Sequence, residues 1–220
     1  MDQLPQCIEL QTAPQPDASV IWLHGLGADG HDFEPIVPAL GLGPAAALRF
    51  VFPHAPIRPV TVNMGMRMRA WYDIVELGGG HEDEAGIRAS QRLLEALVAR
   101  ERERGIASRR IVLAGFSQGG AIALQTGLRH PERLAGVMAL STYLPVAHTL
   151  AAERNSANAG VPIFMAHGGD DEIIAIGRAE RSREALEALG YAVQWASYPM
   201  GHAVCGEEIA AIAAWLGRVL

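Results

Sequence analysis

The 220-residue sequence predicts an α/β fold, a single domain over residues 1–220 with a mostly parallel, doubly wound sheet. Two observations lead to this prediction. Short β-branched and apolar runs alternate with longer segments of helical periodicity. The short runs are apolar throughout, which is typical of parallel strands buried on both faces by helices. No linker divides the chain and no internal repeat is present, so a second domain is not expected.

Six strands and four helices are predicted along the chain. The strands span 19–24, 48–52, 110–116, 134–140, 161–167 and 191–198, and the helices span 82–103, 118–130, 176–189 and 203–219. The helix over 82–103 has apolar residues at helical spacing, an acidic first turn, and Gly105 after its end. The stretch 53–80 is rich in Gly and Pro and too long for a plain connection, so we expect a functional loop there.

The charged residues exclude several classes of function. The 18 basic residues are all Arg and 24 residues are acidic, which gives a net charge of −6. A negative chain does not suit non-specific binding to nucleic acid or to anionic membranes. Schiff-base chemistry and Walker-type phosphate binding both require Lys, which the sequence lacks. Arg100, Arg102 and Arg104 alternate with Glu101 and Glu103, so we expect a solvated helix face there.

The sequence also predicts a cytoplasmic protein without integral membrane association. No apolar run reaches the roughly 18 residues that a membrane span requires. The first residues are acidic and interrupted by Pro, unlike the basic and then apolar regions of a secretory signal. The two cysteines, Cys7 and Cys205, fit neither a disulfide framework nor a zinc site.

A first glycine motif, Gly25-Leu26-Gly27-Ala28-Asp29-Gly30, follows the predicted strand 19–24. It has the spacing of a dinucleotide-binding turn, which makes an NAD-linked oxidoreductase an alternative hypothesis. That function needs an acidic residue at the end of the next strand to bind the ribose. The next strand ends in Pro53 and His54 instead, so the nucleotide interpretation is disfavoured.

A second glycine motif, Gly115-Phe116-Ser117-Gln118-Gly119, lies where a predicted strand meets a predicted helix. This is the position of a nucleophile elbow, in which small neighbours permit a strained turn that exposes the serine Oγ. The alternative is a serine that only caps the helix beside tightly packed glycines. The motif therefore makes Ser117 a candidate nucleophile.

A serine nucleophile needs a base and a carboxylate, and the elbow order is Ser, then Asp or Glu, then His. The strand 161–167 leads into Asp170 and Asp171, and the strand 191–198 leads into His202. Both loops follow the carboxyl ends of strands, where α/β sheets place their sites. The residues alone do not separate Asp170 from Asp171. We interpret His167 as structural, and a Cys205 thiol nucleophile is disfavoured because no elbow presents it.

A serine acyl-transfer site also needs two N–H groups aimed at the developing oxyanion. The residue after the nucleophile, Gln118, would provide one backbone N–H. The His-Gly-Leu-Gly segment 24–27 is similar to the His-Gly loops that provide the other in lipases, which points to the backbone N–H of Leu26.

Four segments carry a family resemblance: HGLGADG at 24–30, PHAPIRPVTVNMGMRMRAWYDI at 53–74, GFSQGG at 115–120 and PMGH at 199–202. Together they resemble the small carboxylesterase and acyl-protein thioesterase (phospholipase/carboxylesterase) family of α/β-hydrolases. The resemblance implies an α/β-hydrolase fold without a large cap domain. It also implies hydrolysis of carboxylic esters or thioesters, or of lysophospholipids, by Ser117, His202 and an aspartate, without metal or organic cofactor.

The same resemblance bears on details of the site and on assembly. The family's acid loop, laid on HGGDDEIIA at 167–175, implies Asp171 as the catalytic aspartate. Glu172 and Ala175 replace the family's prolines, so this loop lacks the rigidity that the prolines provide. The family also implies a homodimer acting on small or acylated substrates, and the negative charge predicts no nucleic-acid partner.

The segment 63–77 is a candidate acyl-binding wall because Met side chains adapt to flexible chains. Its candidate residues are Met64, Met66, Met68, Trp71 and Leu77, of which Met66, Trp71 and Leu77 are the predicted substrate contacts. The alternative is that these side chains pack the loop onto the sheet. A catalytically silent binding module is a further alternative for the whole chain, although no triad member is missing.

Overall fold

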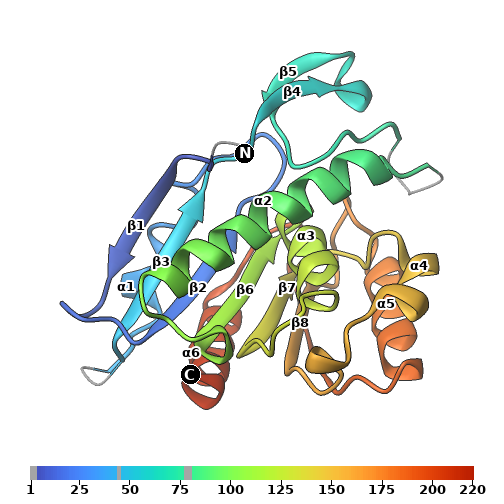
Figure 1. The fold of residues 1–220 in the computed structure, drawn as a ribbon. Helices are drawn as coiled ribbons and strands as arrows, with labels where there is room; N and C mark the ends of the chain where they lie inside the picture. Colours follow the sequence, from blue (N-terminus) through green and yellow to red (C-terminus); the bar gives the residue numbers. More distant parts are fainter. Residues whose placement is uncertain (1–3, 44–45, 77–80) are drawn as a thin grey trace.

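The computed structural model describes residues 4–43, 46–76 and 81–220, and in them a seven-stranded sheet forms the centre of the molecule (Figure 1). In spatial order the strands are β1 (Cys7–Gln11), β3 (Leu48–Pro53), β2 (Ala18–Leu23), β6 (Ile111–Phe116), β7 (Gly136–Leu140), β8 (Ile163–Gly168) and β9 (Val193–Tyr198). β1 pairs antiparallel with β3, and each of the other pairs is parallel.

Helices cover both faces of this sheet. They are α1 (Ile36–Ala39), α2 (Glu84–Glu103), α3 (Gln118–Gly127), α4 (Ala147–Glu153), α5 (Ile176–Ala188) and α6 (Gly206–Val219). Two apolar cores result, one against α2, α3 and α5 and the other against α1 and α6. β2 contributes to both, because Ile21 and Leu23 enter the first core while Val20 and Trp22 enter the second.

The predicted mostly parallel sheet and the six predicted strands are confirmed, with ends that move by one or two residues. The four predicted helices are also present, although α3 ends at Gly127 rather than at 130 and α6 begins at Gly206 rather than at 203. The sequence did not predict β1, whose position at the sheet edge leaves most of its side chains half-buried. It carries polar residues that break the apolar pattern expected of a strand.

The segment 53–80 contains a second element that the sequence did not predict. β4 (Ile57–Val60) and β5 (Met66–Arg69) form an antiparallel hairpin that projects from the body of the molecule (Figure 1). Three residues in the 3₁₀ helix η1 (Thr61–Asn63) lie at its turn. The hairpin stands beyond the carboxyl ends of the sheet strands, and the chain after it returns to the sheet at Ala70 and Trp71, which are buried.

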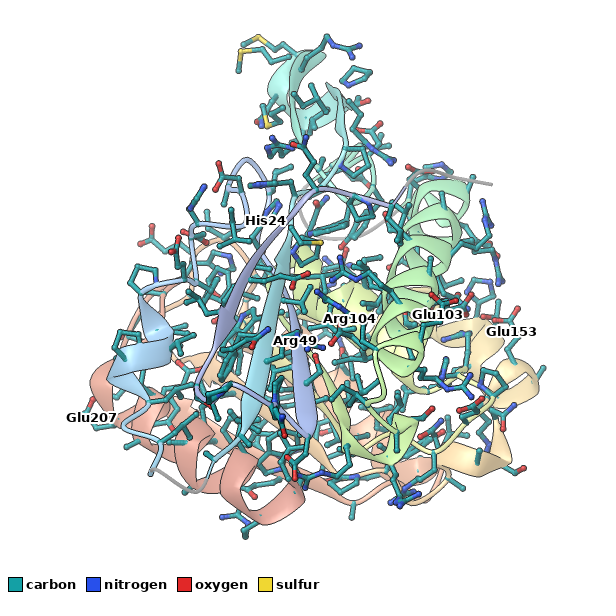
Figure 2. All side chains as sticks on the ribbon, turned by 60° about the vertical axis from the view of Figure 1, so that its left-hand side comes forward. His24, Arg49, Glu103, Arg104, Glu153 and Glu207 are labelled. Carbon is teal, nitrogen blue, oxygen red and sulfur yellow. The ribbon has the colours of Figure 1, made fainter. Side chains whose placement is uncertain are left out.

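The expectation of a solvated face at Arg100–Arg104 is wrong for Glu101. Its side chain is fully buried and binds Arg49 Nη1 at 2.9 Å and Arg104 Nη1 at 2.8 Å. Arg49 of β3 and Arg104 after α2 are labelled in Figure 2, on the side of the sheet that α2 covers. Glu101 thus joins α2 to β3, whereas Arg102, Glu103 and Arg104 are exposed, as expected of a solvated face.

In the described part of the chain, no helix is both long enough and apolar enough to span a membrane.

Candidate active site

Ser117 lies in a strained turn between β6 and α3. Its backbone has φ 54° and ψ −121°, a left-handed conformation that is uncommon for a residue with a side chain. The turn is held by the N–H of Ser117, which donates to the Leu140 carbonyl at 2.9 Å, and by the Thr142 hydroxyl, which donates to the Ser117 carbonyl at 2.6 Å. This is the geometry predicted for a nucleophile elbow.

The glycines around Ser117 are required by close backbone approach. A Cβ on Gly115 would lie 2.2 Å from the Gly119 carbonyl carbon, and a Cβ on Gly119 would lie 2.3 Å from the Leu23 carbonyl oxygen. Any side chain at either position would therefore push α3 away from β6 or β2. The glycine pattern is explained by the packing of the elbow against the sheet.

His202 and Asp171 form a hydrogen-bonded pair at the carboxyl ends of β9 and β8. Nδ1 of His202 donates to Oδ2 of Asp171 at 2.7 Å, and Asp171 is buried. Asp170 is exposed, and its backbone N–H binds the Met200 carbonyl. The two aspartates that the residues alone left open are thus separated, since Asp171 is the one that contacts His202.

The other contacts of Asp171 fix the acid loop. Oδ1 accepts the backbone N–H groups of Ile173 and Ile174 at 2.9 and 2.8 Å. His167, fully buried, lies with Nε2 3.3 Å from Oδ2 and 2.7 Å from the Ile174 carbonyl. The carboxylate therefore organises the loop that lacks the family's prolines. The sequence predicts a structural role for His167 but not its position beside Asp171.

A cavity of about 280 Å³ opens at this end of the sheet. Ser117 and His202 both line it, together with Leu26 and Gln118. The ring of Phe116 packs against the His202 ring, with centroids 4.7 Å apart. The structure thus brings to one cavity the predicted nucleophile, base and oxyanion donors, with Asp171 behind His202.

A further part of the cavity wall combines aromatic rings with charges. Tyr72 and Tyr143 share a hydrogen bond of 2.8 Å between their hydroxyls, and the Arg178 guanidinium lies 3.3 Å from the centroid of the Tyr143 ring. Glu82 Oε1 is 3.8 Å from Arg178 Nη2. Burial raises the pKa of both tyrosines, so they stay neutral donors and acceptors. These residues were not among the predicted site residues, although Tyr143 follows the end of β7, where site residues are expected.

None of the described candidates for the acyl-binding wall lines this cavity. Met66 is exposed on β5 of the projecting hairpin, and Met64 is exposed at its turn. Trp71 is buried against the sheet, as the alternative interpretation expects. Leu77 lies outside the described residues. Cys205 precedes α6 as its N-cap and does not line the cavity.

The structure disfavours the nucleotide hypothesis for Gly25–Gly30. A dinucleotide site needs a helix that begins in the glycine turn, so that its N-terminus faces the pyrophosphate. Here the next helix, α1, begins at Ile36 and has four residues. The turn instead places Gly25 and Leu26 on the cavity that Ser117 lines.

Comparison with known proteins agrees with this geometry. The family model described as Phospholipase/Carboxylesterase matches residues 7–220. The chain belongs to the phospholipase/carboxylesterase family. It is therefore an α/β-hydrolase and an enzyme that acts on ester bonds, as the sequence predicted.

Relatives within the family include thioesterases. Acyl-protein thioesterase 1 of Gibberella zeae is 41% identical over 218 residues, covering 94% of this chain and 93% of that protein. Among solved structures, Arabidopsis thaliana SOBER1 aligns with a TM-score of 0.88 and 29% identity, over 92% of this chain and 98% of SOBER1. Zea mays acyl-protein thioesterase 2 aligns with a TM-score of 0.84 and 26% identity, over 98% and 99% of the two chains.

Proposed function

We propose that this enzyme hydrolyses carboxylic esters and thioesters through a covalent acyl-enzyme on Ser117. The observation that carries the proposal is the 2.7 Å contact of His202 Nδ1 with Asp171, beside a cavity that His202 shares with Ser117. With Nδ1–H directed to the carboxylate, Nε2 of His202 is the nitrogen free to take a proton. This is the tautomer that a general base for Ser117 requires.

In the proposed mechanism, Ser117 Oγ attacks the acyl carbonyl while His202 Nε2 accepts its proton. Asp171 keeps the imidazole oriented and stabilises the imidazolium that forms. The backbone N–H groups of Leu26 and Gln118 bind the oxyanion. His202 then protonates the leaving alcohol or thiol, and a water that gives its proton to His202 attacks the acyl-enzyme and releases the acid.

Replacement of the nucleophile tests this proposal. Ser117→Ala should lower kcat for p-nitrophenyl butyrate by roughly 10⁴-fold or more. A fluorophosphonate probe should label the wild-type enzyme at Ser117 and leave Ser117→Ala unlabelled. Thr126→Val, which changes a buried hydroxyl in α3 that does not line the cavity, is the matched control. Esterase activity that survives Ser117→Ala, or a wild type that is not labelled, would contradict the assignment and favour a silent binding module.

The thioester part of the proposal is supported by the acyl-protein thioesterases among the relatives. Esters and thioesters develop the same oxyanion, so one site geometry serves both. A panel of acyl esters and acyl thioesters of matched chain length, assayed with wild type and Ser117→Ala, distinguishes an esterase from an enzyme that prefers thioesters.

We further propose a cytoplasmic homodimer that does not bind nucleic acid. The net charge of −6 supports the absence of a nucleic-acid partner, and the free Cys7 and Cys205 are consistent with a reducing compartment. The dimer is an expectation from the family resemblance. Light scattering during gel filtration tests it, and a monomer mass would reject it.

A further inference from the structure

We propose that Trp71 and the side chain of Gln118 are positioning residues. They hold the backbone N–H groups of Leu26 and Gln118 at the spacing that binding of one oxyanion requires. The inference rests on the proposed function. It assigns Trp71, which the sequence predicted as a substrate contact, to a framework behind the site.

The two N–H groups are available for an oxyanion. In the described part of the chain, neither the Leu26 N–H nor the Gln118 N–H donates to a protein acceptor. Both residues line the cavity beside Ser117. These groups come from separate loops, one after β2 and one after β6, so something must fix the distance between them.

The loop after β2 is fixed on both sides of Leu26. On one side, the Gly27 N–H donates to the Arg69 carbonyl at 2.9 Å. On the other side, the His24 ring lies with Nδ1 2.7 Å from the Gly25 carbonyl and accepts the Ala55 N–H at Nε2, at 3.0 Å. Because Nε2 is an acceptor, the ring proton is on Nδ1 and donates to Gly25. The peptide between Gly25 and Leu26 is thereby held in one orientation.

Burial keeps His24 in this form. It lowers the pKa of His24 to about 4, so the ring is neutral near neutral pH and retains the acceptor that Ala55 needs. Figure 2 labels His24 at the end of β2, below the projecting hairpin. The first oxyanion loop is therefore tied to Ala55, which precedes the hairpin, and to Arg69, the last residue of β5.

Trp71 connects this loop to the second one. Its indole Nε1–H donates to the His24 carbonyl at 2.9 Å, and its backbone N–H donates to Oε1 of Gln118 at 3.0 Å. The indole also packs against the His24 ring, with centroids 5.3 Å apart. One residue thus contacts both loops through two different donors, and it is 1% exposed.

The Gln118 side chain completes the connection. Its Nε2 donates to the Tyr72 carbonyl at 2.8 Å while its Oε1 accepts from Trp71, so the amide spans two consecutive residues of the segment after the hairpin. Its own backbone N–H donates to no acceptor among the described residues. The Gln118 side chain therefore connects the elbow to the segment after the hairpin, and its backbone N–H is the oxyanion donor. A substitution can remove the side-chain amide while retaining the backbone N–H.

Such a framework matters because oxyanion stabilisation depends on donors that are already in place. A misplacement of about 1 Å can cost on the order of 10²-fold in rate. The hydrogen bonds of Trp71 and Gln118 reach no substrate atom in this arrangement. Their loss should therefore lower kcat, which reports the transition state, more than it raises KM.

Two substitutions test the proposal. Trp71→Phe removes the indole N–H and keeps an aromatic ring, and Gln118→Met removes the amide while keeping the backbone N–H and the side-chain length. Each should lower kcat for p-nitrophenyl butyrate by about 10- to 100-fold with KM within about threefold. Affinity for a trifluoromethyl ketone, which forms a tetrahedral adduct with Ser117, should fall in parallel with kcat/KM.

Trp22→Phe is the matched control. Trp22 is also 1% exposed, but its indole N–H has no partner among the described residues, so the substitution removes ring area without removing a hydrogen bond. It should retain wild-type kcat. Each kcat is divided by the fraction of enzyme that a fluorophosphonate labels at completion, so that a partly unfolded variant does not imitate a positioning defect.

Two outcomes would overturn the inference. In the first, the kcat values of both Trp71→Phe and Gln118→Met lie within twofold of the kcat of Trp22→Phe. In the second, KM rises in both variants while kcat is unchanged. A failure of the proposed function is distinguishable, because the wild type itself would then show no activity above Ser117→Ala. Should Trp71→Phe fail to fold, Gln118→Met decides alone.

Discussion

Several parts of the site depend on the carboxylate of Asp171. It accepts from the backbone of Ile173 and Ile174, pairs with His202, and lies 3.3 Å from Nε2 of His167. The Ile174 carbonyl only accepts hydrogen bonds, so the contact at 2.7 Å puts a proton on His167 Nε2. That N–H therefore donates to the Ile174 carbonyl, and the His167 ring supports the acid loop beside Oδ2 of Asp171.

Replacement of His167 should consequently reduce activity. His167→Leu removes the donor to the Ile174 carbonyl, which holds the loop that carries Asp171. A hydrogen bond of this kind contributes roughly 0.5–1.5 kcal/mol. We expect kcat/KM for p-nitrophenyl butyrate to fall about tenfold. His167→Gln, whose amide retains a neutral donor, should recover most of the loss. Equal activities of the Leu and Gln variants would show that the donor does not matter.

Among individual residues, the sequence predicts the reacting groups better than the residues that hold them in place. Ser117 and His202 stand out because their motifs follow strands and occur in the expected order. The sequence does not show that Trp71 binds His24 and Gln118, because those contacts span 47 residues and depend on how the hairpin returns to the sheet. Nor does it show which of two adjacent aspartates faces His202.

Among the elements, α2 is joined to the sheet edge by buried charges as well as by its apolar face. Glu101 contacts Arg49 of β3 and Arg104, and Glu9 of β1 contacts Arg100 and Arg104. Burial alone would raise the pKa of Glu101, but the hydrogen bonds from Arg49 and Arg104 outweigh it and keep the pKa below the usual value. The carboxylate is thus ionised and paired.

Removal of this carboxylate should be strongly destabilising. Glu101→Gln leaves the buried Arg49 without its anion, and breaking a buried pair from one side typically costs about 3–5 kcal/mol. We expect a matching decrease in the free energy of unfolding measured with urea. Glu103→Gln, an exposed neighbour on the same helix, should change it by no more than about 0.5 kcal/mol. Similar values for the two variants would contradict the role of Glu101.

The elements that the sequence predicts are those with one clear period. β2, β3, β7 and β8 are buried along their whole length, so their apolar runs are unbroken. β1 and the β4–β5 hairpin lie at the edge of the sheet or outside it, where half of each strand meets water and the apolar signal is lost. The alternating Arg and Glu residues predict a solvated helix face, which is wrong for Glu101. A single segment does not show ion pairs that form with other elements, such as the pair of Glu101 with Arg49.

For the whole molecule, two buried groups oppose each other in their dependence on pH. The pKa of His24 is about 4, below its usual 6.5, so its contribution to stability is present above pH 6.5 and lost as the pH falls toward 4. Burial raises the pKa of Glu208 to about 7 from 4.5, against the effect of the Cys205 backbone. Protonated Glu208 is neutral and tolerates burial, so its contribution to the stability of the protein is present below pH 4.5. That contribution is lost as the pH rises through 7.

A neutral residue at position 208 should therefore stabilise the protein at high pH. Glu208→Gln should raise Tm little at pH 5 and by several degrees at pH 8, because the charged form costs up to about 3 kcal/mol there. Thermal unfolding at the two pH values measures the difference. Glu207→Gln, an exposed carboxyl in the same helical turn, should show the same change in Tm at both. A pH-independent effect of Glu208→Gln would reject the explanation.

β9 is the last strand of the sheet, and the loop that follows it carries His202. Its side chains are half-buried or exposed along its whole length, whereas those of its neighbour β8 are fully buried. A strand with such small burial is among the first parts of a domain to separate locally. Gentle warming would then withdraw the imidazole from a serine that remains well ordered, and catalysis would cease while most of the protein is still native.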